Sequence, residues 1–134
     1  MTLGTAGLTA TLHTSFGDAV EQTTQALAEQ GFGVLTRIDV KATLKQKLGE
    51  DMEDYLILGA CNPRLAHRAL DVDRHIGQLL PCNVVVRTAE DGGVLVEAMD
   101  PQLMVRVWDQ PGLQEVADEA AAKLQAAIGK LSRA

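Results

Sequence analysis

Aromatic residues are scarce in this sequence. Trp108, Tyr55, Phe16 and Phe32 are the full set among 134 residues. A core built from this composition is aliphatic, and stacking platforms for nucleic acid bases are not expected. A hydrophobic share of 46% and a charged share of 22% are typical of a folded chain and argue against disorder. We therefore expect residues 1–134 to form one domain.

Clusters of basic residues and long apolar runs are also missing. The formal net charge is −6, whereas nucleic acid binding depends on neutralising phosphates. No apolar stretch approaches the ~20 residues that cross a bilayer, and the start MTLGTAGLTA lacks a basic segment followed by an apolar run. Two cysteines are too few for a disulfide scaffold. These absences predict a cytoplasmic protein that binds neither nucleic acid nor a membrane.

The spacing of apolar residues predicts alternating strands and helices. The expected order is a strand at 5–14, a helix at 16–31, a strand at 34–40, a helix at 41–48, a strand at 55–61, a helical segment at 63–80, strands at 83–89 and 94–99, and a last helix from 111 onward. Ser15 is the expected cap of the first helix. The strand at 55–61, YLILGAC, is apolar on both faces, so we expect it at the centre of the sheet.

The two strands that flank the EDGG turn are expected to form a hairpin. A three-residue loop of residues 91–93 would place Val86 opposite Ala98. A two-residue loop would place Val86 opposite Glu97 and bring a charge onto the apolar face, so the longer loop is preferred.

The most suggestive stretch for chemistry is LGACNPRLA at residues 58–66. Asn62 is a good N-cap and Pro63 suits the first helical position, so Cys61 ends a strand just before a helix N-terminus. Free backbone N–H groups and the helix macrodipole favour an anion there, which would make Cys61 a nucleophile or a soft ligand. Arg64, and Arg68 one turn later, would hold an anionic ligand beside it. The alternative is that Cys61 is a small buried hydrophobe and the arginines are merely exposed.

The segment at 63–80 decides whether Cys82 can share a site with Cys61. A single straight helix would be about 27 Å long and would leave the two thiols at opposite ends of parallel strands. A bend near Val72, with Asp73 capping a second helix, would bring the chain back beside itself. The two strands would then be antiparallel and both cysteines would share one edge. Periodicity alone leaves both layouts open.

Other residue types give weaker signals. The spacing of His67 and His75 from the two cysteines matches no standard zinc pattern, so no metal site is predicted. Glu97 and Asp100 would serve as a general base, but ion pairing or helix capping is the simpler role for each.

Two stretches carry a resemblance to a known family. YLILGACNP at residues 55–63 and IGQLLPCNV at 76–84 resemble the prokaryotic domain-of-unknown-function 302 family. The resemblance extends from about Phe16 to Leu131. The family pattern often has proline where this chain has Arg74, which fits a helix break after Val72.

The resemblance implies an α+β fold of the TATA-binding-protein-like kind, with helices over one face of an antiparallel sheet, and a homodimer. It favours the returning layout but implies no activity or cofactor. We then expect a domain that binds or carries a small thiol, a sulfur species, a redox signal or a soft metal. Its expected ligand-binding residues are Cys61, which is the reactive or ligating group, Cys82, Asn62 and Arg64. The alternative is a noncatalytic dimerisation or ligand-binding module whose cysteines only pack.

Overall fold

The structure is a computed structural model that describes residues 8–132. Its elements are β1 (Thr9–Leu12), α1 (Phe16–Glu29), β2 (Gly33–Asp39), α2 (Val40–Leu48), β3 (Tyr55–Cys61), α3 (Pro63–Val72), the 3-10 helix η2 (Arg74–Leu79), β4 (Cys82–Thr88), β5 (Val94–Ala98), α4 (Gln102–Val107) and α5 (Leu113–Ser132). All neighbouring strands are antiparallel, in the order β1-β5-β4-β3-β2. The predicted α+β class and element order are confirmed, with α4 as an additional helix. No helix in the described part of the chain is both long and apolar enough to span a bilayer.

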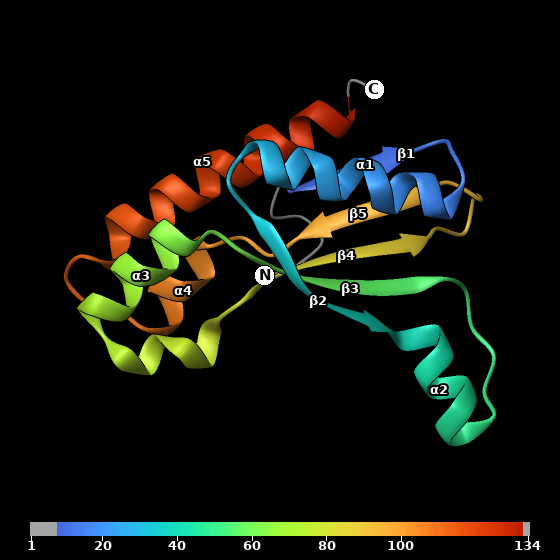
Figure 1. Cartoon of the computed structure of the whole chain (residues 1–134), viewed down its shortest axis with the longest axis horizontal. Helices are drawn as coiled ribbons and strands as arrows, with labels where there is room; N and C mark the ends of the chain where they lie inside the picture. Colours follow the sequence, from blue (N-terminus) through green and yellow to red (C-terminus); the bar gives the residue numbers. More distant parts are fainter. Residues whose placement is uncertain (1–7, 133–134) are drawn as a thin grey trace.

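Two hydrophobic clusters hold the elements together. The first lies between one face of the sheet and the helices α1 and α5, and the second lies beyond the end of the sheet, where α3, η2 and α4 pack on the first half of α5 (Figure 1). Fully buried members of the first cluster include Leu27, Leu58 and Leu124, and those of the second include Ile76 and Leu113. Because α5 contributes to both clusters, it joins the two parts of the molecule.

The strands follow the predicted burial pattern most closely at the centre of the sheet. β3 lies between β4 and the edge strand β2 and so is paired on both sides, but it is not at the centre of the sheet as expected, and only its second half, from Leu58 to Ala60, is buried. β2 is an edge strand with a bulge after Val34, and its Leu35 and Ile38 side chains are 69% and 50% exposed. The predicted strand at 5–14 is seen as Thr9–Leu12, and residues 5–7 lie outside the described residues.

The helical segment between the cysteines is broken, as one of the two layouts required. α3 ends at Val72, and Asp73 is extended, with φ −159°. The Asp73 carboxylate accepts a 2.9 Å hydrogen bond from the backbone N–H of His75 and so caps η2. It also accepts a 2.6 Å bond from the indole of Trp108, after α4. A straight helix over 63–80 is therefore ruled out, and the chain returns antiparallel.

The hairpin between β4 and β5 differs from the prediction in its register. Val86 pairs with Val96 and not with Ala98. The loop has the expected three residues, but it is formed by 90–92 and is closed by a 2.7 Å hydrogen bond between the backbones of residues 89 and 93. Gly92 takes φ +88°, the left-handed conformation that ends this type of loop. Because moving the loop by one residue shifts the strand pairing by two residues, the same side chains stay on the apolar face of the sheet.

Candidate functional site

The returning chain brings both cysteines to one end of the sheet. Ala60 pairs with Cys82, and Cys61 is the last residue of β3. Both thiols are free and half-buried. They line the same cavity, which has a volume of about 40 Å³. Residues that are far apart along the chain thus meet where the sheet ends, as the resemblance implied.

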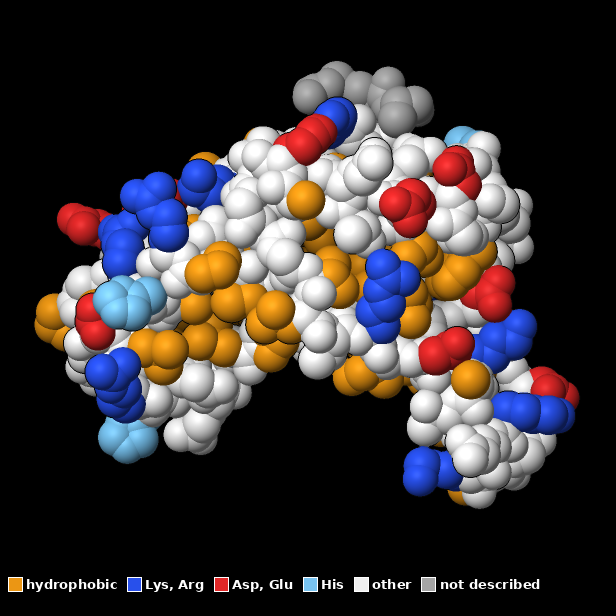
Figure 2. Space-filling view, in the orientation of Figure 1, with side chains coloured by type: hydrophobic (Ala, Val, Ile, Leu, Met, Phe, Trp, Pro, Cys, Tyr) orange, Lys and Arg blue, Asp and Glu red, His pale blue; other side chains and the backbone are white. Residues whose placement is uncertain are grey.

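The cavity lies between the two hydrophobic clusters, and we call it the sulfur cavity because four sulfur-bearing residues line it. These are Cys61, Cys82, Met99, which follows β5, and Met104, in α4. The rest of the wall is mainly aliphatic, from β3, α3, η2 and α5. Figure 2 shows hydrophobic side chains gathered on the surface between α3 and the strands. The wall is therefore apolar but rich in soft donor atoms.

Asn62 is the polar side chain of this wall, and both ends of its amide are engaged. Its Oδ1 accepts a 3.3 Å hydrogen bond from the backbone N–H of Leu65, which caps α3 as predicted. Its Nδ2 donates a 3.3 Å bond to the carbonyl of Gln30, just after α1. Asn62 is only 9% exposed. The residue thus fixes the entry into α3 beside Cys61.

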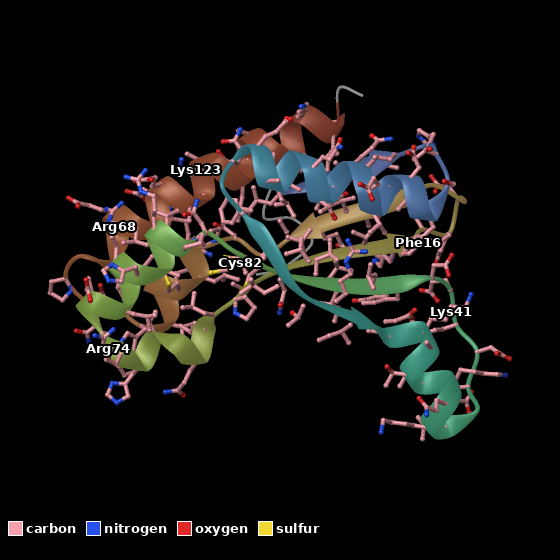
Figure 3. The ribbon with its side chains drawn as sticks, in the orientation of Figure 1. Phe16, Lys41, Arg68, Arg74, Cys82 and Lys123 are labelled. Atoms are coloured by element: carbon pink, nitrogen blue, oxygen red, sulfur yellow. The ribbon has the colours of Figure 1, made fainter. Side chains whose placement is uncertain are left out.

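The predicted arginines lie elsewhere. Arg64 is exposed and borders a separate polar hollow, together with Glu119 and Lys123, and it is not among the residues that line the sulfur cavity. Arg68 forms a 2.9 Å ion pair with Glu119. Arg68 and Lys123 are on the outer side of the helices, whereas Cys82 is at the end of the sheet (Figure 3). Arg64 therefore lines the polar hollow, which shares Asn62 with the sulfur cavity, and does not line the sulfur cavity itself.

The protein environment makes Cys82 harder to ionise. Burial, and secondly the negative charge of a Cys61 thiolate, raise the pKa of the Cys82 thiol to about 11. Loss of solvation disfavours any charged form, and a like charge nearby adds to this effect. Cys82 is consequently a neutral thiol at physiological pH.

The histidines and carboxylates considered from the sequence lie outside the sulfur cavity. His67 and His75 are 76% and 73% exposed at their side chains. Glu97 holds Arg87 in a 2.8 Å ion pair on the sheet. Asp100 accepts a 2.9 Å hydrogen bond from the backbone of Gln102 at the start of α4. Both carboxylates thus have the structural roles that were the simpler expectation.

Sequence reasoning missed the two methionines. Met99 is the last residue of the predicted strand at 94–99, and Met104 lies in α4, which was not predicted because QLMVRV is only six residues long. Methionine is a common filler of irregular core gaps, so nothing in its spacing marks a site. Only the tertiary packing of α4 against α5 reveals that both methionines line the same cavity as the cysteines.

The fold and the cavity define the class: an α+β domain with a five-stranded antiparallel sheet and two thiols in a cavity at its end. The model of the family described as domain of unknown function DUF302 matches residues 8–131, and the chain belongs to this family. A crystal structure of an uncharacterized conserved protein DUF302 from Bacillus stearothermophilus is similar, with 30% sequence identity and a TM-score of 0.84, covering 92% of this chain and 95% of that one. No curated protein matches the sequence.

Proposed function

We propose that this chain is a ligand-binding or carrier domain whose site is the sulfur cavity. Cys61 is the reactive or ligating group and Cys82 is its partner. The observation that supports this function is that two thiols from distant parts of the chain line one small apolar cavity. Both cysteines are free, which supports a reducing compartment such as the cytoplasm.

The size and chemistry of the cavity narrow the class of ligand. A cavity needs about 10–15 Å³ to hold one water molecule, so a volume of about 40 Å³ has room for only a few atoms. The cavity therefore accepts a ligand of very few atoms, such as a single sulfur atom, a soft metal ion, or the thiol end of a larger molecule. Because no charged side chain lines the wall, a carboxylate or phosphate would be left without a partner there.

A second function has support from a different part of the molecule. Leu35 and Ile38 expose 69% and 50% of their surface on the edge strand β2, and an exposed apolar edge strand is a site where another chain can pair. In this alternative the protein is a noncatalytic homodimerisation module, and its cysteines only pack.

Native mass spectrometry of the protein purified from its source cells separates the two functions. We expect the wild-type chain to carry a bound metal or sulfur adduct that is absent from the Cys61→Ser variant. The result against the site would be an unmodified wild-type mass together with Cys61→Ala and Cys82→Ala variants that lose only ~1–3 kcal/mol of stability through the cavities they leave. A dimer mass that persists in both variants would then favour the homodimerisation module.

A further inference from the structure

The composition of the sulfur cavity is unusual for a packing defect. The whole chain has two cysteines and four methionines, and this single cavity takes both cysteines and two of the methionines. Thiolate and thioether sulfurs are soft ligands that select Cu(I), zinc and Fe–S clusters, whereas carboxylates and waters select hard cations. The wall thus presents one class of donor from four positions.

Competing donors are absent from the wall. Asn62 supplies the polar side chain, and its oxygen and nitrogen are both used in hydrogen bonds to backbone. No group of three or more His, Cys, Asp or Glu residues able to hold a metal ion occurs within residues 8–132. A zinc or magnesium ion would therefore lack the ligands it needs here, while a two-thiolate site with thioethers suits a soft monovalent ion.

The strand register also favours a bridging ion over a disulfide. Cys82 pairs with Ala60, so Cys61 is one residue out of register with it. Successive residues of a strand point to opposite faces, and the Cβ vectors of the two cysteines therefore start in different directions. A disulfide needs Cβ atoms about 3.8 Å apart that point toward each other. An ion bonded to both sulfur atoms does not need the two Cβ atoms at the disulfide spacing, and both cysteines line the same cavity.

The methionine backbones are held in place. The N–H of Met99 donates a 2.9 Å hydrogen bond to the carbonyl of Asn83, so Met99 extends β5 next to Cys82. The N–H of Met104 donates a 3.0 Å bond to the carbonyl of Pro101, and Trp108 closes the same short helix with a 2.9 Å bond to the carbonyl of Met104. Both thioethers are thus anchored to elements that pack in the wall of the cavity.

We propose that the sulfur cavity binds one Cu(I) ion through Cys61 and Cys82, with the thioethers of Met99 and Met104 completing an all-sulfur ligand set. This inference rests on the proposed function and names its ligand. Binding forms copper–sulfur bonds and releases the thiol protons to solvent, and copper remains Cu(I) throughout.

The test is an anaerobic titration of the full chain with Cu(I) in competition with a coloured Cu(I) chelator, followed by X-ray absorption at the copper edge. We expect one Cu(I) per chain and a shell of sulfur only. Cys61→Ser and Cys82→Ser should each weaken binding at least about 100-fold, and the double variant Met99→Leu, Met104→Leu about tenfold. Leucine conserves the volume of methionine, so the double variant keeps the fold.

Met52→Leu is the matched control, because Met52 lies between α2 and β3 and does not line the cavity; its affinity should equal that of the wild type. Unchanged Cu(I) affinity in the double methionine variant would remove the thioethers from the ligand set. Nitrogen or oxygen in the copper shell would overturn the all-sulfur set. Both results could be read even if the cysteine variants failed to fold. If no Cu(I) binds while native mass spectrometry still finds a Cys61-dependent adduct, this inference fails and the proposed function stands. If neither is found, both fail.

Discussion

Cys82 is the first residue of β4 and packs against the first hydrophobic cluster. Its pKa is raised to about 11 by burial and by the nearby Cys61, and only the thiolate reacts with alkylating agents. We therefore expect iodoacetamide at pH 8 to modify Cys82 much more slowly in the native protein than in urea. The native rate should rise only above pH 9, as followed by mass spectrometry of Cys61→Ser protein, in which Cys82 is the only thiol and burial alone raises its pKa.

The raised pKa of Cys82 also makes the stability of the fold depend on pH. An unfolded chain loses the Cys82 proton at a lower pH than the folded chain, so the folded form gives up stability as the pH rises through this window. A native alkylation rate that matched the rate in urea at every pH would show that the cavity does not protect Cys82. Cys82→Ser is the control for the stability effect, because it has no thiol at position 82 to ionise.

The break between α3 and η2 is the element on which the site depends. Asp73 makes this break by accepting hydrogen bonds from His75 and Trp108, and these bonds hold its pKa below the ordinary carboxyl value of 3.8. A lowered carboxyl pKa contributes stability above pH 3.8 that is lost as the pH falls below it. We expect Asp73→Asn to lower the melting temperature at pH 7 and to flatten the acid side of the stability curve.

Thermal unfolding from pH 2 to pH 7, followed by Trp108 fluorescence, measures this effect. Asp71→Asn is the matched control, since Asp71 is exposed and its contacts with His67 and Arg74 are 3.6 and 3.9 Å long. If both variants showed the same loss, the cap at Asp73 would have no special role in the break.

The same elements show what a sequence can and cannot predict. Local chemistry identified the caps at Ser15, Asn62 and Asp73, because a capping side chain bonds to residues within one turn. The hairpin register was wrong because EDGG allows glycine at more than one loop position, and only cross-strand packing chooses Gly92. The bend at Val72 was one of two open layouts, since apolar periodicity continues through a break that preserves the buried face.

At the scale of the whole molecule, the candidate site was half predictable. Both cysteines were singled out from the sequence because Cys61 ends an apolar strand just before a helix cap and Cys82 opens the next strand. Met99 and Met104 were missed, and Arg64 was expected beside the thiols, because helix spacing fixes a residue's face but not the neighbour that this face meets. The sulfur cavity lies where the two hydrophobic clusters join. The spacing of apolar residues predicts each buried face but not how the two clusters meet.

This junction predicts how the domain unfolds. α5 is one continuous helix whose Leu113 is buried in the second cluster and whose Leu124 is buried in the first. Because neither cluster can lose α5 without exposing the other, we expect one cooperative transition, which would support the proposal that the chain is a single domain. Leu113→Ala and Leu124→Ala should each cost ~2–5 kcal/mol, whereas Leu48→Ala, at a side chain 68% exposed, should change stability by at most about 0.5 kcal/mol. Fluorescence of Trp108, whose indole bonds to Asp73 at the break between α3 and η2, reports that part of the molecule, and far-ultraviolet circular dichroism reports the whole chain, so the two curves should coincide in urea. Separate midpoints in Leu113→Ala would instead show that α3, η2 and α4 unfold as a unit of their own, and that the sulfur cavity opens before the sheet does.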